Sequence, residues 1–180
     1  MERQLPKNVR QIGNVSDSPK IYVEDYVYTY LNKLAQPENL YARGAILFGK
    51  MYKTTIGKCM FISGAAACQN FELDLDETIF SEENWGEIYR IRDSFFPELE
   101  ICGWFLSRMG FSVDLNDKII RIHMDNFSGE NKVLYMIDAL ENDTFSIQAH
   151  DSVFQNFLTH LCRKFRRIGV VPVNHQIALC

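Results

Sequence analysis

The stretch "ICGWFLSRMGFS", residues 101–112, decides the predicted fold. It opens as an apolar run, "ICGWFL", which is typical of a strand buried on both faces of a sheet. Amphipathic patterns lie on either side of it. Ser81 caps a predicted helix over 82–96, and Asn116 caps another over 116–127. A buried strand between two helices predicts a mixed α/β domain.

Working outward, helical and strand patterns continue in both directions. An apolar stripe that begins at Ile21 predicts a helix over 21–35, ended by Pro37. The runs over 44–49 and 59–67 predict a hairpin. Further strands are expected over 70–80, 132–138 and 144–150. Together these elements predict a curved, mixed β-sheet flanked by the helices 21–35, 82–96 and 116–127.

The chain divides into three parts. Residues 1–20 lack periodicity and contain Pro6, Gly13 and Pro19, so we expect an extended arm. Residues 21–150 form the predicted domain. Residues 151–180 predict a C-terminal amphipathic helix and tail, with this apolar stripe at helical spacing: Val153, Phe154, Phe157, Leu158, Leu161 and Phe165.

Charge is unevenly divided between these parts. Residues 1–150 carry 15 basic and 22 acidic side chains, or −7, whereas residues 151–180 carry four basic and one acidic, or +3. We therefore expect the C-terminal helix to dock on its own acidic domain. An acidic partner or an anionic membrane surface is the alternative for a basic amphipathic helix.

Composition limits the function classes. The chain is 47% hydrophobic and 23% charged, as in folded soluble proteins, and its net charge of −4 argues against nucleic-acid binding. No signal peptide or apolar stretch of about 18 residues is evident, so membrane association is not expected. The five cysteines are scattered and odd in number, which favours free thiols in the cytoplasm.

The motif "GWFLSRMGF" (103–111), with a "VLYMID" strand after it, resembles the MPN domain family, also called JAB or JAMM. The likeness covers roughly residues 20–148 and rests on these residues: Gly103, Trp104, Ser107, Gly110 and Phe111. It implies a cytidine-deaminase-like fold. Active members read Gly-Trp-Tyr/Phe-His-Ser/Thr-His-Pro-Gly-Phe here and hold zinc with two histidines and an aspartate. A glutamate on the first strand is their general base.

Carried onto this sequence, the resemblance implies that the chemistry is lost. Leu106 and Arg108 stand at the two histidine positions, Asn116 at the serine and Ile119 at the aspartate. The glutamate position falls at residue 41 or 42, and neither is acidic. Catalytic zinc needs about three protein ligands. Leucine and isoleucine have no lone pair to donate, and arginine is cationic. We expect no metal and no cofactor.

Other side chains offer little chemistry by pattern. His123 is expected to be a partly exposed helix residue, and Cys102 to fill the core as an inert thiol. Arg108, with Trp104, is the candidate for a cleft that binds an acidic group, although an ordinary surface arginine is favoured. Trp104 itself is expected to be buried.

The function expected from the resemblance is that of a catalytically inactive domain, a cytoplasmic protein-binding or scaffold module. Metal-free members of the family pair with other proteins through their helices, which implies a protein partner or a homo- or heterodimer. Two alternatives remain open at this point. One is a hydrolase of another class with a rebuilt cleft. The other is a fragment of an envelope-associated protein that carries a LysM module elsewhere.

Overall fold

The computed structural model describes residues 6–13, 19–36, 42–69, 71, 80–108, 115–127, 129, 131–138 and 144–148. The strand predicted over 70–80 lies outside these residues, apart from Phe71 and Phe80, which are both buried. The predicted C-terminal helix and tail, 151–180, lie wholly outside them.

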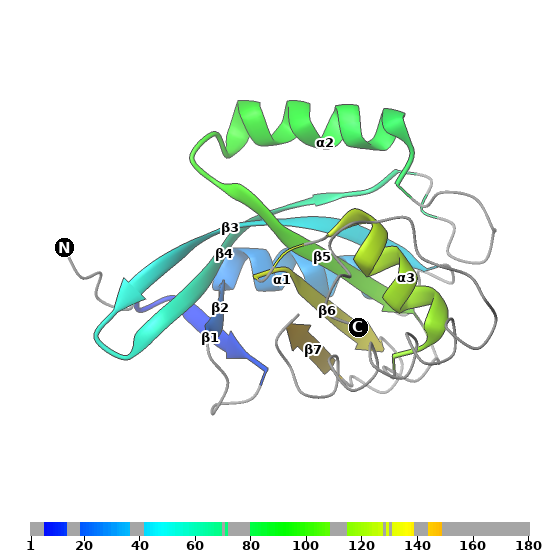
Figure 1. The fold of residues 1–180 in the computed structure, drawn as a ribbon. Coiled ribbons are helices and arrows are strands. Elements are labelled where there is room, and N and C mark those ends of the chain that lie inside the picture. Colours follow the sequence, from blue (N-terminus) through cyan, green and yellow to red (C-terminus); the bar gives the residue numbers. More distant parts are fainter. Residues whose placement is uncertain are drawn as a thin grey trace.

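The described chain folds into one mixed sheet with helices on both faces (Figure 1). The elements follow in this order: β1 Val9–Ile12, β2 Lys20–Glu24, α1 Asp25–Leu34, β3 Arg43–Thr54, β4 Gly57–Ala67, α2 Glu82–Phe95, β5 Glu100–Arg108, α3 Asp117–Asn126, β6 Val133–Asp138 and β7 Thr144–Gln148. The seven strands are arranged as β1-β2-β4-β3-β5-β6-β7. The pairs β2/β4 and β5/β6 are parallel and the other pairs are antiparallel. The predicted curved, mixed sheet flanked by helices is confirmed.

Strand alternation sorts the core into two layers. In β3, Ile46 and Phe48 face the layer that contains α2 and α3, whereas Ala45 and Leu47 face α1. In β5, Trp104 faces α2 and α3 in the same way. Both faces of the central strands are therefore covered, which explains why these strands read as continuous apolar runs.

The start of the first helix differs from the prediction. Ile21 and Val23 lie in β2, and the helix begins only at Asp25. These two side chains and Tyr22 between them are buried, and β2 pairs with Cys59–Ile62 of β4. Burial on both faces favours a strand here over a helix. The predicted hairpin is confirmed, although its first strand runs to Thr54, five residues beyond the predicted end, and the helices over 82–96 and 116–127 are confirmed to within one residue at each end.

The expected N-terminal arm also differs from the structure. Val9–Ile12 form β1, an antiparallel edge strand whose register runs from Val9 opposite Glu24 to Ile12 opposite Ile21. Arg10 donates to Asp25 at 3.0 Å and so ties this strand to the first turn of α1. Part of the first twenty residues therefore belongs to the sheet.

Gly103 sits where β5 and β6 approach most closely. Its φ is +151°, and a Cβ added there would lie 1.9 Å from the carbonyl oxygen of Val133. The neighbouring strand's backbone fills this space, so no side chain fits. The glycine that opens the "GWF" motif is thus required by strand packing, whatever chemistry follows it.

We expect Gly103→Ala to destabilise the fold by about 3 kcal/mol or more, because strand backbones must separate to admit the methyl group. Gly86→Ala is the matched control. A Cβ at Gly86, inside α2, meets nothing within 4 Å, so alanine should raise stability by about 0.5–1 kcal/mol through helix propensity. Urea denaturation of the two variants tests this. Equal midpoints would contradict the close approach.

Candidate functional site

Two of the three positions that the resemblance aligns with metal ligands, Leu106 and Ile119, carry hydrocarbon side chains in the core. Leu106 on β5 and Ile119 on α3 are each 1% exposed, and both belong to the buried cluster beneath α2 and α3. Trp104, fully buried, is in the same cluster. The fold therefore brings Leu106 and Ile119 into one apolar environment that offers a cation no ligand.

The remaining motif residues are separated by the fold. Ser107 is buried, and strand alternation turns it toward the face opposite to Leu106. Arg108 ends β5, is half-buried, and lies opposite the buried Asp138 of the parallel strand β6. Asn116 caps α3, and its side-chain oxygen accepts a hydrogen bond from the backbone N–H of Ile119 at 3.0 Å. This confirms the predicted helix start.

A buried hydrogen bond joins β5 to α3. The indole Nε1–H of Trp104 donates to Nδ1 of His123 at 3.0 Å, and the rings of Trp104 and Phe127 stack at 6.1 Å, 8° from parallel. The expectation of a partly exposed His123 is wrong, because its side chain is 3% exposed. Ile119, Ile120, His123 and Phe127 recur at helical spacing, and this pattern would have placed the histidine on the inner face.

Burial alters the acid–base behaviour of two groups in this core. Desolvation, and secondarily the nearby charge of Lys132, lower the pKa of His123 from 6.5 to about 4. Burial raises the pKa of Cys102 to about 12, and its Sγ donates to the carbonyl of Leu47 at 3.3 Å. The thiol therefore stays protonated near neutral pH, and the prediction that Cys102 fills the core is confirmed.

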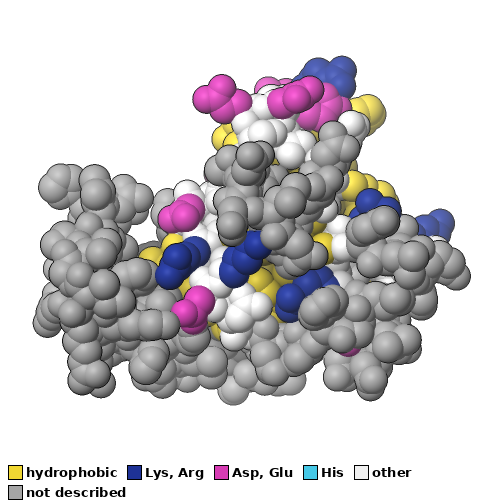
Figure 2. Space-filling model, turned by 90° about the vertical axis from the view of Figure 1, so that its right-hand side faces the viewer, with side chains coloured by type: hydrophobic (Ala, Val, Ile, Leu, Met, Phe, Trp, Pro, Cys, Tyr) yellow, Lys and Arg dark blue, Asp and Glu magenta, His cyan; other side chains and the backbone are white. Residues whose placement is uncertain are grey.

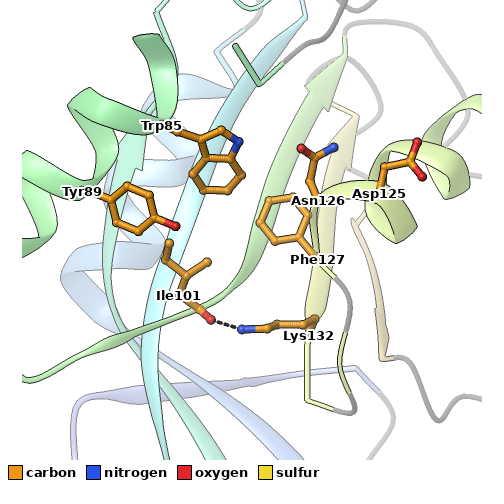
Figure 3. Close-up of a pocket in the computed structure, with 7 residues that line it drawn as sticks. All are labelled: Trp85, Tyr89, Ile101, Asp125, Asn126, Phe127 and Lys132. Carbon is orange, nitrogen blue, oxygen red and sulfur yellow. Dashed lines mark hydrogen bonds between the residues drawn. The ribbon is translucent and has the colours of Figure 1, made fainter. Parts of the chain in front are cut away.

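An open groove of about 540 Å³ lies between α2 and the end of α3 (Figure 3). Trp85 and Tyr89 of α2 form one wall, with ring centroids 5.9 Å apart, and Phe127 lies opposite, 5.9 Å from Trp85. Asp125 and Asn126, at the end of α3, line the same side as Phe127.

One end of the groove carries a positive charge. Lys132 Nζ donates to the backbone carbonyl of Ile101, the first apolar residue of β5. The ammonium group is half-buried beside Phe127. Sequence patterns placed Trp85 and Tyr89 on a helix, but no pattern indicated that Phe127 and Lys132, from a helix end and a loop, would face them.

Exposed aromatic side chains gather on the helices. Among the described residues, five large hydrophobic side chains are exposed, and four of them lie on α1 and α2: Tyr26, Tyr30, Tyr89 and Phe95. Phe95 is the most exposed, at 74%. Figure 2 shows acidic side chains gathered over α2, next to hydrophobic ones.

The described residues contain no group of three or more His, Cys, Asp or Glu side chains placed to hold a metal ion. None of the described helices is both long and apolar enough to cross a bilayer. In comparisons with known proteins, no family model and no curated protein matches this chain.

The lowered pKa of His123 predicts a pH-dependent stability. Because its folded-state pKa is about 4 and the unfolded value is 6.5, the unfolded chain binds more protons between these values. The contribution is fully present above pH 6.5 and is lost as pH falls through 4. The expected loss is about 3 kcal/mol.

His123→Asn is the matched control, since the asparagine oxygen can accept the Trp104 hydrogen bond but does not titrate. Urea denaturation of both proteins between pH 7.5 and 4 isolates the histidine from the carboxylates, which titrate in both. Parallel stability curves for the two proteins would contradict the assignment.

Proposed function

We propose that this chain is a metal-free, MPN-like domain that acts as a protein-binding or scaffold module and not as an isopeptidase. The main support for this proposal is that Leu106 and Ile119 are packed with Trp104 in the core. A catalytic zinc site needs ligands with lone pairs and an open position for water, and this part of the domain supplies neither.

Exposed aromatic residues on the helices support the protein-binding part of the proposal. Aromatic side chains are enriched in protein interfaces, where they supply large buried area. Tyr89 and Phe95 on α2 are 44% and 74% exposed, and Tyr26 and Tyr30 expose a second aromatic surface on α1. A partner, or a second copy of the chain, would bind through these helices.

A cytoplasmic location completes the proposal. Cys59 and Cys102 are buried, and Cys68 is half-buried, with all three thiols free. Such free thiols suit a reducing compartment.

The purified chain should contain zinc far below one ion per molecule and should not cleave isopeptide-linked substrates. Elemental analysis of protein purified without chelator measures the first, and a linked diubiquitin assay measures the second. An active metalloisopeptidase, measured in parallel, controls for the assay. One tightly held zinc per chain, lost to a chelator together with isopeptidase activity, would contradict the proposal.

Partner binding through α2 is tested by Phe95→Asp. Because Phe95 is largely exposed, aspartate should leave stability nearly unchanged while placing a charge inside the proposed interface. Ile56→Asp is the matched control, since Ile56 is 45% exposed but lies in the turn between β3 and β4.

Quantitative mass spectrometry of proteins captured from source cells should show a partner retained by the wild type and by Ile56→Asp but lost with Phe95→Asp. If the partner is a second copy of the chain, analytical ultracentrifugation of the same variants should show a dimer that is lost with Phe95→Asp. Identical captured proteins and identical masses for all three chains would exclude α2 as the interface.

A further inference from the structure

The aromatic groove between α2 and α3 has walls suited to a helix with an apolar stripe. Trp85 and Ile101, both half-buried, and the exposed Tyr89 present apolar surface along an open depression of about 540 Å³, which the buried Phe127 also borders. Tyr89 is 44% exposed, so a large aromatic surface is available for contact. Apolar surface of this kind is stabilised when another element removes it from water.

The helix that forms one wall of the groove, α2, is acidic, whereas Lys132 places a positive charge at one end of the groove. Residues 82–100, which include α2, carry six acidic and two basic side chains, or −4. The two basic ones are already engaged, Arg90 with Glu87 and Arg92 with Asp93. Within the described part of the chain, no ion pair involves Glu82 or Glu83, and α2 begins with these two carboxylates. This surface attracts a cationic occupant.

The chain itself contains a segment with the matching properties. Residues 151–180 carry +3, and their apolar side chains recur at helical spacing. As a helix, the 13 residues 153–165 would extend about 20 Å, close to the roughly 21 Å of the 14-residue α2. Four basic side chains cluster at the end of this segment: Arg163, Lys164, Arg166 and Arg167.

The segment also starts beside the groove. Gln148, the last residue of β7, lies opposite Val133 in the sheet, and Val133 directly follows Lys132, which lines the groove. Ile101, on the groove floor, belongs to β5, two strands from β7 and thus about 10 Å away. The four residues 149–152 can span about 13 Å when extended. Residue 153 can therefore reach the groove.

We propose that residues 153–165 dock on the groove between α2 and α3 of the same chain, with the apolar stripe on Trp85, Tyr89 and Ile101. The basic residues at the end of this segment then lie against the acidic helix α2. This contact covers Tyr89 but leaves both Phe95 and the Leu106–Ile119 core untouched, so it can be tested apart from partner binding through Phe95.

The two tryptophans of the chain provide the test, because Trp85 lines the groove and Trp104 is fully buried. In the full chain labelled with 5-fluorotryptophan, fluorine NMR gives one resonance for each, assigned with Trp85→Phe. Phe157→Asp combined with Leu161→Asp should shift the Trp85 resonance by well over its linewidth. The same double substitution should also increase the quenching of tryptophan fluorescence by acrylamide. The Trp104 resonance should stay in place.

Gln155→Asp combined with Thr159→Asp is the matched control, since it adds the same charge to the opposite side of the segment. Neither resonance should move in this chain. If the aspartates at 157 and 161 unfold the protein, alanines at the same two positions give the same comparison. Partner binding through Phe95 is measured in a separate experiment. Docking of residues 153–165 and partner binding can therefore be disproved independently of each other.

Three results would overturn the docking. An unchanged Trp85 resonance would show that the segment does not reach the groove. A Trp85 resonance that depends on protein concentration would assign the groove to a second copy. A shift of both tryptophans in the alanine chain would mean that the segment supports the whole core and not the groove.

Discussion

The hydrogen bond from Trp104 to His123 holds α3 against the sheet on the face where the groove lies. Both groups are buried, and an indole N–H without an acceptor in such an environment would cost about 1–3 kcal/mol. The bond sets the distance between the central strand β5 and α3. Phe127, stacked on Trp104, is thereby held at the end of α3, where it faces Trp85. The groove wall thus depends on a polar contact inside the core.

Much of the architecture was predictable because its determinants are local. Asn116 and Ser81 accept hydrogen bonds from backbone N–H groups in the first turns of their helices, and their positions alone marked both helix starts. The two short apolar runs on either side of the polar residues and Gly57 likewise indicated the hairpin of β3 and β4. The start of the first helix was predicted wrongly for a non-local reason. Ile21–Val23 have a helix-compatible pattern, but pairing with β4 makes them a strand, and sequence does not reveal that partner.

The candidate site was less predictable than the fold. Leu106 and Ile119 could be placed near each other only through a resemblance, whereas their burial in a common cluster follows from the strand and helix faces. The groove needs Trp85, Phe127 and Lys132 together, which come from two helices and a loop. Nothing in local periodicity specifies how a helix end and a loop converge. The burial of His123, by contrast, was predictable, since its spacing from Ile119 and Ile120 places it on the inner face of the helix.

The hydrocarbon side chains of Leu106 and Ile119 have a structural consequence of their own. Burying Leu106 and Ile119 contributes about 1.5–3 kcal/mol each, whereas histidine or aspartate in the same places would have to be solvated or paired. An open, hydrated metal site and this closed layer cannot coexist at the same positions. With that layer closed, the accessible aromatic surface of the described residues lies further out, at the groove between α2 and α3 and on the exposed faces of α1 and α2. Binding by this domain is accordingly proposed for the helices, and the central strands serve to hold them in place.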